Sequence, residues 1–254
     1  MRLKLTQPSN LGNARGFDRF LARCYCPDVA LDVAPRVIIL LAALLPAAPA
    51  ARADEPTGRP PLLERLQAKL ETVTSLKGRF IQRLDAPALG RQRTERGTFS
   101  IKRPDRMRWE YEKPERKLAV TDGVTTWLYV PEDHEAHAGR PDDLEGGGAM
   151  MLLAGRLRLS EDFSARGLSS EEAGPQGFAG AEVLELTPRR GGEEFEKLVV
   201  AVDPESLQMR RLTVVDAVGD RMIFDFFDLV ENPELDDALF TFEPPPGTEV
   251  IDER

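Results

Sequence analysis

The sequence predicts a mainly β protein: a large curved antiparallel sheet or barrel, with a few helices packed over it. Three observations lead to this fold class. Apolar side chains recur at every second position through much of residues 76–111, which is typical of half-buried strands. Asp122-Gly123 separates two further β-prone runs and is the strongest short-range hairpin signal in the chain. Helical spacing is confined to stretches too short to build a core of their own, so we expect them to cover the sheet.

The first element expected, residues 1–53, is an export signal that is removed and takes no part in the fold. Residues 37–51 (VIILLAALLPAAPAA) are apolar throughout, follow Arg36 and precede an A-x-A cleavage pattern. A helix of that length reaches roughly 22 Å, less than the roughly 30 Å hydrocarbon core, which favours a signal over a membrane anchor. The mature domain is therefore expected to be residues 54–254, exported to the periplasm.

The cysteine count and the net charge exclude several functions for the mature chain. Cys24 and Cys26 both precede the apolar run, so residues 54–254 have no cysteine for a disulfide, a thiol reaction or a lipid anchor. Those residues carry 27 Lys and Arg against 40 Asp and Glu. This acidic balance argues against nucleic acid as a partner, because phosphate binding needs a basic surface.

The mature domain is expected to open with one amphipathic helix and to continue as strands. Leucines and a valine at helical spacing follow Pro60-Pro61, at positions 62, 63, 66, 70 and 73. The period then changes to two, and three strands are expected, carrying on one face the residues Leu76, Gly78, Phe80, Gln82 and Leu84, then Gly97, Phe99 and Ile101, then Met107, Trp109 and Tyr111. A hairpin of residues 118–121 and 125–130 follows.

The second half is expected to begin with a loop and a short apolar helix. Residues 134–148 are polar and end in Gly146-Gly147-Gly148, and residues 149–154 (AMMLLA) are the apolar helix. Strands return at 183–186, 195–202, 207–215 and 222–230, and residues 233–240 are expected to form a last short helix.

Several motifs, in order along almost the whole mature chain, resemble the LolA family of periplasmic lipoprotein carriers. Arg103-Pro104, Trp109, Pro114, Thr121-Asp122-Gly123 and the run WLYVP at 127–131 resemble its central signature. The early FIQ at 80–82, the helix MMLLA at 150–154 and the closing FTFEPPPG at 240–247 match further motifs of the family. Each motif is weak alone, and their order and spacing carry the resemblance. It implies an incomplete antiparallel β-barrel covered by a helical lid, enclosing an apolar cavity for acyl chains.

Arg103 is the residue that the resemblance singles out. In the family, the arginine of this Arg-Pro step hydrogen-bonds backbone carbonyls of the lid helices and holds the empty carrier closed. A guanidinium has five N–H donors and can reach several carbonyls at once. By sequence pattern alone, an exposed arginine in a screened ion pair is commoner than one that binds backbone carbonyls. The resemblance favours the second case, in which Arg103 acts as the latch of the lid.

Six further residues align with cavity or lid positions of the family. A stripe of aromatic residues and methionines is more often plain core than a ligand site, although methionine adapts well to irregular apolar guests. The resemblance assigns the acyl-chain cavity and lid to Leu70, Phe80, Met107, Trp109, Met150 and Met151.

The sequence gives little support for catalysis or for a bound metal. His134 and His137 form a short HEAH motif without an obvious third ligand, so a solvated loop is favoured over a metal site. There is no nucleophile–base pattern and no Gly-rich phosphate loop. We expect no enzymatic activity, no metal and no cofactor.

The resemblance implies a monomeric periplasmic chaperone that carries lipoproteins from the inner to the outer membrane. Its expected partners are acylated lipoproteins, an inner-membrane lipoprotein-releasing ABC transporter, and the outer-membrane receptor LolB or that membrane directly. Three alternatives stay open: a LolB-like receptor, a lipoprotein-sensing regulatory module, and a lipid-processing hydrolase.

Overall fold

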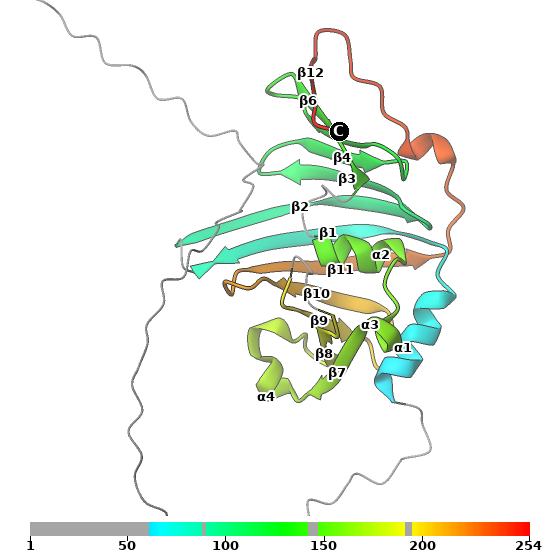
Figure 1. Cartoon of the computed structure of the whole chain (residues 1–254), viewed down its shortest axis with the longest axis vertical. Helices are drawn as coiled ribbons and strands as arrows, with labels where there is room; N and C mark the ends of the chain where they lie inside the picture. Colours follow the sequence, from blue (N-terminus) through cyan, green and yellow to red (C-terminus); the bar gives the residue numbers. More distant parts are fainter. Residues whose placement is uncertain (1–60, 88–89, 142–146, 191–194) are drawn as a thin grey trace, which may run out of the picture. The chain divides into compact units, whose positions relative to one another are not determined.

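The computed structural model of the chain describes residues 61–87, 90–141, 147–190 and 195–254 (Figure 1). The predicted export segment, residues 1–53, and the predicted hinge glycine Gly146 lie outside the described residues.

Twelve strands form the main part of the described fold. They are β1 (Ser75–Ala86), β2 (Arg91–Lys102), β3 (Arg106–Lys113), β4 (Lys117–Thr121), β5 (Thr126–Val130), β6 (Glu135–Gly139), β7 (Phe163–Leu168), β8 (Glu182–Pro188), β9 (Lys197–Val202), β10 (Met209–Val215), β11 (Arg221–Glu231) and β12 (Glu249–Asp252). The helices are short: α1 (Leu62–Glu71), α2 (Gly147–Ala154), α3 (Leu159–Asp162), α4 (Ser170–Ala173) and the 3-10 turns η3 (Gly174–Gln176) and η4 (Asp237–Phe240).

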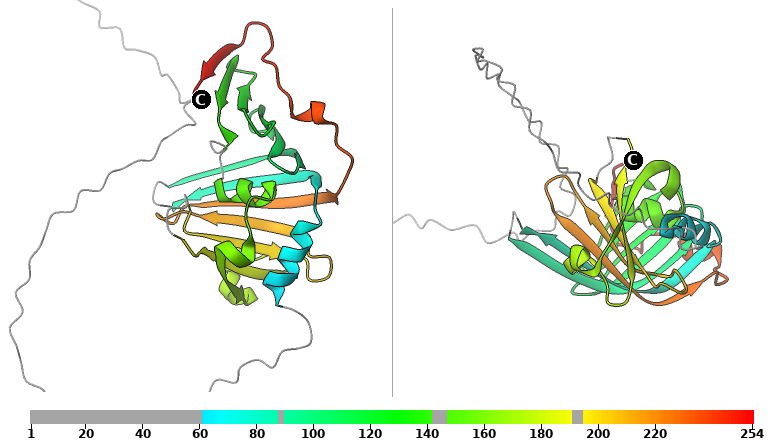
Figure 2. Two further views of the ribbon diagram at one scale, coloured as in Figure 1. Left: turned by 45° about the vertical axis from the view of Figure 1, so that its right-hand side comes forward. Right: turned by 90° about the horizontal axis from the view of Figure 1, so that it is seen from below.

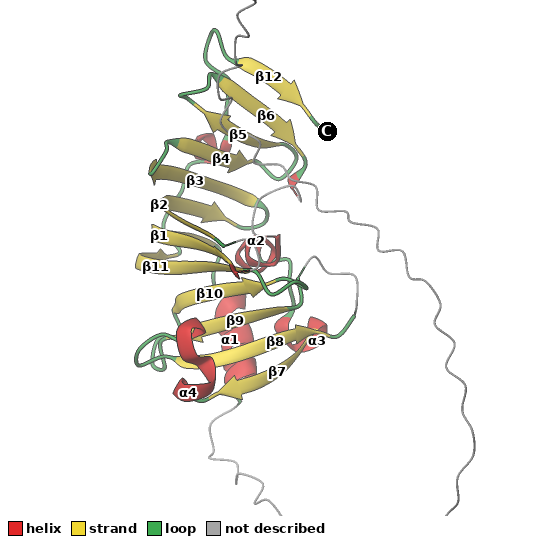
Figure 3. Ribbon diagram, turned by 90° about the vertical axis from the view of Figure 1, so that its left-hand side faces the viewer, coloured by secondary structure: helices red, strands yellow, loops and turns green. Residues whose placement is uncertain are grey.

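All twelve strands belong to one sheet, in the order β12-β6-β5-β4-β3-β2-β1-β11-β10-β9-β8-β7 (Figures 1 and 3). Neighbours are antiparallel except β6 and β12, which run parallel. The sheet has two edges, β12 and β7, so it is an incomplete barrel, and it curves around α1 and α2 (Figure 2). The predicted mainly β fold class is therefore confirmed.

The period-two pattern places the large apolar side chains on one face of the sheet, here called the inner face. In β3, Met107, Trp109 and Tyr111 are buried while the residues between them are not. The same alternation runs along β1 and β2, whose cross-strand partners include Phe80 opposite Gly97. A residue in place of Gly97 would put its Cβ 1.8 Å from the Glu110 carbonyl oxygen, so the close approach of β2 and β3 requires glycine there.

The predicted hairpin is confirmed as β4 and β5. Asp122 Oδ1 accepts hydrogen bonds from the backbone N–H groups of Val124 and Thr125, both at 2.8 Å, and Gly123 has a φ of 95°. An aspartate that caps its own turn and a glycine at positive φ are what a tight connection between antiparallel strands needs.

Helices α1 and α2 cover the inner face and are called the lid. Leu62, Leu63, Leu66 and Leu70 lie on the packed side of α1, as their spacing predicted. Helix α2 is apolar on every side, and six of its eight residues are buried. A helix without a polar face is stable only when other elements surround it.

Four elements differ from the sequence expectation. The segment expected as a solvated loop contains β6, where Ala136 and Ala138 are 0% and 1% exposed. Their small side chains gave too weak an apolar alternation to indicate a strand. Strands β7 and β12 were also not predicted, because they are short edge strands with mostly exposed residues and no clear apolar alternation. The helix expected over 233–240 is limited to the single turn η4.

Candidate functional site

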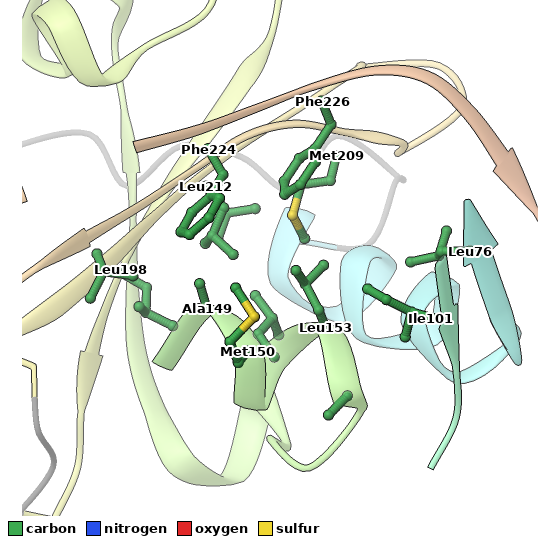
Figure 4. Close-up of a cluster of buried hydrophobic side chains, with 14 of the residues drawn as sticks. Leu76, Ile101, Ala149, Met150, Leu153, Leu198, Met209, Leu212, Phe224 and Phe226 are labelled. Atoms are coloured by element: carbon green, nitrogen blue, oxygen red, sulfur yellow. The ribbon is translucent and has the colours of Figure 1, made fainter. Parts of the chain in front are cut away.

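An apolar cluster fills the space between the lid and the inner face. Figure 4 shows Ala149, Met150 and Leu153 of α2 directed at residues of the sheet. The facing side chains come from both halves of the strand order and include Leu76, Ile101, Leu198, Met209, Leu212, Phe224 and Phe226. The lid is therefore part of the core in this conformation.

Aromatic rings form the centre of the cluster on β1, β2, β3 and β11. Trp109 is 1% exposed and stacks on Phe99 with 5.0 Å between ring centroids. Phe80 meets the Trp109 ring edge-on at 4.8 Å, and Phe224 lies at 5.8 Å from it. Such pairs contribute about 0.5–1.5 kcal/mol each beyond the burial of their surface.

Among the described residues, little free space lies between α1 and the sheet. A cavity of about 30 Å³ lies between α1 and the sheet, lined mainly by leucines with Phe99, Phe226 and Arg103. A volume of that size accommodates roughly two water molecules, far less than a fatty acyl chain. An acyl chain does not fit between α1 and the sheet in this conformation.

Arg103, just past the end of β2, connects both lid helices to the sheet. Its Nη1 donates to the carbonyl oxygens of Leu70 at 2.5 Å and Val73 at 3.2 Å, at the end of α1. Its Nε donates to Leu153 O at 3.0 Å, and Nη2 to Leu152 O at 3.4 Å, in the last turn of α2. Four backbone carbonyls from two helices thus converge on one guanidinium.

The physical basis of this contact is the carbonyl groups at the C-terminal ends of the two helices, of which Leu70 O and Leu152 O also accept a backbone N–H. The last carbonyls of a helix lack an intrahelical donor and carry the negative end of its dipole, so a cation at that end is favourable. Arg103 has no carboxylate partner within ion-pair distance among the described residues, and burial lowers the pKa of its guanidinium. Carbonyl dipoles take the place of a counter-ion here.

Gly155 closes the space around the guanidinium. It has a φ of 79°, and a Cβ at this position would lie 2.9 Å from Arg103 Cδ. The residue directly after α2 therefore has to be small for the arginine to reach the carbonyls of both helices.

Ion pairs and a side-chain contact surround Arg103 on the outside of the lid. Arg156 Nε donates to Asp105 Oδ1 at 2.5 Å, and Arg158 Nη1 donates to Glu71 Oε1 at 3.1 Å. Gln67 of α1 accepts from the backbone N–H of Leu159 at 2.7 Å. Beside these contacts is an open groove of about 330 Å³, lined by both lid helices and by Arg103.

Five of the six predicted cavity residues lie in the cluster beneath or within the lid. Phe80, Met107, Trp109 and Met150 are buried members, and Leu70 packs against them while its carbonyl binds Arg103. Met151 is half-buried and is not a member of the cluster.

Two groups of residues at the site were not predicted from the sequence. Phe224, Phe226 and Leu212 come from strands whose apolar runs were seen but not linked to the site. The acceptors for Arg103 at Val73, Leu152 and Leu153 are main-chain oxygens, which carry no signal in the sequence.

The two histidines do not form a metal site in the described part of the chain. His137 lies on β6 with Nε2 3.7 Å from Glu135 and Nδ1 3.6 Å from Glu253. No group of three or more His, Cys, Asp or Glu side chains is placed to hold a metal among the described residues. No helix among those residues has the length and apolar character to cross a membrane.

Comparison with known proteins shows which family this chain resembles. A family model described as "Outer membrane lipoprotein carrier protein LolA" matches residues 71–243. The outer-membrane lipoprotein carrier protein of Azotobacter vinelandii is 31% identical over 218 residues, which cover 85% of this chain and 98% of the relative. That of Chromohalobacter salexigens is 32% identical over 192 residues, covering 75% and 86%. The crystal structure of a LolA superfamily protein from Nitrosomonas europaea aligns with a TM-score of 0.38 and 12% identity, covering 71% of this chain and 97% of that one.

Proposed function

The chain belongs to the LolA family of outer-membrane lipoprotein carriers, and from this premise we propose how it holds and releases its cargo. Members of the family are periplasmic transport chaperones and not enzymes, and carrying outer-membrane lipoproteins is the function of this chain. The proposal concerns the parts of the molecule that do this: a lid latched by Arg103 over an inner face that receives acyl chains.

The observation that carries the proposal is the set of four carbonyls around Arg103. Hydrogen bonds from a charged donor are roughly twice as strong as neutral ones. Since the acceptors belong to the ends of both α1 and α2, one side chain holds the two lid helices in the closed position.

Loading exchanges one set of apolar contacts for another. Each acyl methylene removed from water contributes ~0.8 kcal/mol, which drives the chain onto the inner face. Met150 and Leu153 occupy that face in the closed state, so the acyl chain displaces them together with α2. Breaking the Arg103 hydrogen bonds offsets part of the gain, which keeps the loaded state strained.

This strain lets the cargo leave without a nucleotide. When a more apolar site or a membrane accepts the acyl chains, the lid closes again and the Arg103 bonds re-form. Closure of the lid therefore makes the free energy of transfer more favourable.

We assign the remaining features from the family. Residues 1–53 act as an export signal that is removed, and residues 54–254 are the carrier domain in the periplasm, acting as a monomer. An inner-membrane ABC transporter loads the acylated lipoprotein, and LolB or the outer membrane itself receives it. N-terminal sequencing of the periplasmic protein checks the first point, and a mature chain that begins far from residue 54 would contradict it.

The latch is tested by an Arg103→Leu variant in a transfer assay with a fluorescently labelled lipoprotein. The variant loses the bonds that form only in the empty state, so we expect it to fold, to accept cargo and to release it several-fold more slowly to acceptor membranes. Arg108→Leu is the matched control, because Arg108 contacts a single backbone carbonyl, that of Leu239, elsewhere in the fold. Transfer by the Arg103 variant at the rate of the unmodified protein would remove the latch from the mechanism.

A further inference from the structure

An unpaired polar atom lies in the aromatic centre of the inner face. The indole nitrogen Nε1 of Trp109 is buried and has no hydrogen-bond acceptor among the described residues. A buried N–H without a partner is rare in folded proteins, and it carries an unfavourable free energy because it has lost water and gained nothing.

Neighbouring polar groups on the same face do have partners. Tyr111, two residues further along β3, donates from its hydroxyl to Gln82 Oε1 at 3.0 Å. Gln82 Nε2 in turn lies 3.6 Å from the sulfur of Met222. Trp109 Nε1 differs from these two neighbours in having no acceptor among the described residues.

The indole is also held in a fixed position. Phe99 stacks on it, Phe80 meets it edge-on and Phe224 packs beside it, so three rings define its orientation. A phenylalanine at 109 could make ring contacts of this kind. The feature that only tryptophan supplies here is the N–H donor.

The lid packs into the apolar cluster that contains this donor. Trp109 belongs to the same apolar cluster as Met150 and Leu153 of α2, which leave the inner face when cargo enters. A fatty acyl chain brings one polar atom of its own to such a site: the carbonyl oxygen of the ester or amide that joins it to the rest of the molecule. That oxygen also loses water on binding and accepts a hydrogen bond.

We propose that Trp109 Nε1 donates a hydrogen bond to the carbonyl oxygen of a cargo acyl linkage, and that the inner face thereby selects acyl chains over equally apolar alkyl chains. The inference rests on the proposed carrier function and adds a specificity-determining contact to it. In the empty protein the N–H of Trp109 has no acceptor, which raises the free energy of the empty state. Binding of an acyl carbonyl removes this cost and so favours the loaded state.

Three probes built on one short fluorescent peptide test this contact. One carries a hexadecanoyl ester, one a hexadecanoyl amide and one a hexadecyl ether, which lacks the linkage carbonyl. We expect the unmodified protein to bind the ester and the amide about three- to tenfold more tightly than the ether, the range of one buried hydrogen bond. Trp109→Phe should bring the two acyl probes to the affinity of the ether and leave the ether unchanged.

Trp127→Phe is the matched control, because this second tryptophan packs against Phe242, away from the cluster of the inner face. It should keep the preference for acyl probes. Equal affinities of all three probes for the unmodified protein would overturn the inference and leave the carrier function intact, and so would a preference that survives in Trp109→Phe. Failure of the unmodified protein to bind any of the three would overturn the proposed acyl-chain site as well.

Discussion

The two faces of the sheet are covered in different ways. The lid covers the inner face by apolar contact, and one arginine ties both of its helices through main-chain carbonyls. Two ion pairs, Arg65–Glu182 and Lys69–Glu231, also join α1 to the sheet. The other face, over β3 to β5, is covered by residues 233–254, here called the outer cover, which is fixed by several independent kinds of contact.

The contacts of the outer cover are distributed along its length. Phe242 packs against the rings of Trp127 and Tyr129, at 5.7 and 5.3 Å between centroids. Asp237 pairs with Lys102 at 2.5 Å and Arg106 at 2.7 Å. Strand β12 then adds to the sheet beside β6.

The difference indicates which cover can move. Removing the outer cover would break a strand pairing, ion pairs and ring contacts at once, so it is part of the cooperative fold. The lid makes no strand pairing, and in the proposed mechanism an acyl chain replaces its apolar contacts. Elements that move in function belong to the parts of a structure that open most easily. By this comparison, the lid opens more easily than the outer cover.

The largest expected effect comes from truncating the anchor of the outer cover. Phe240 is 2% exposed, and Phe240→Ala should lower the free energy of unfolding by about 3–5 kcal/mol through lost burial and the cavity left behind. Urea titration followed by circular dichroism measures it. A loss below about 1 kcal/mol would mean that the outer cover is not part of the cooperative fold.

The matching truncation in the lid should act locally. Leu153 is 3% exposed, and Leu153→Ala should lower the free energy of lid opening by about 2–4 kcal/mol. Native-state hydrogen exchange should show faster exchange in α1 and α2 with little change in β1 to β3. Equal acceleration across the sheet and the lid would show that the lid does not open on its own.

A charge on the lid should have an intermediate effect. Met151→Asp places a carboxylate on α2 without entering the buried cluster, and we expect affinity for an apolar fluorophore to fall about three- to tenfold, ~1 kcal/mol. Val250→Asp on the exposed edge strand β12 is the control. Unchanged affinity of the Met151 variant would argue against binding next to this part of the lid.

The smallest effect is expected at the exposed ion pairs of the outer cover. Hydrogen bonds from Lys102 and then Arg106 lower the pKa of Asp237. A carboxylate with a lowered folded-state pKa stabilises the fold above its ordinary pKa, near 4, and loses that contribution as pH falls through the lowered value. Asp237→Asn should therefore unfold at a slightly lower temperature than the unmodified protein at pH 7, and the difference should disappear once the pH falls below the lowered pKa of Asp237. A difference that persists at acidic pH would show that the charge of Asp237 is not its cause.

Local pattern predicted the strands that have large alternating residues and missed those that do not. Trp109 and its neighbours at every second position placed β3 and its inner face correctly. In β6 the alternating buried residues are alanines, and β12 is recognised only through its parallel pairing with residues more than a hundred positions earlier. A short edge strand depends on its neighbour more than on its own sequence.

The sequence by itself determined the fold class, the face on which each large apolar residue lies and, through its resemblance to a family, the importance of Arg103. These properties follow from side-chain periodicity and motif order, which are local along the chain. The tertiary structure alone decided that the lid packs into the core of the inner face, that main-chain carbonyls of two helices bind Arg103, and that the Trp109 indole N–H has no acceptor among the described residues. Each of these depends on the distance between elements far apart in the sequence, and that distance is set by packing and not by any local pattern.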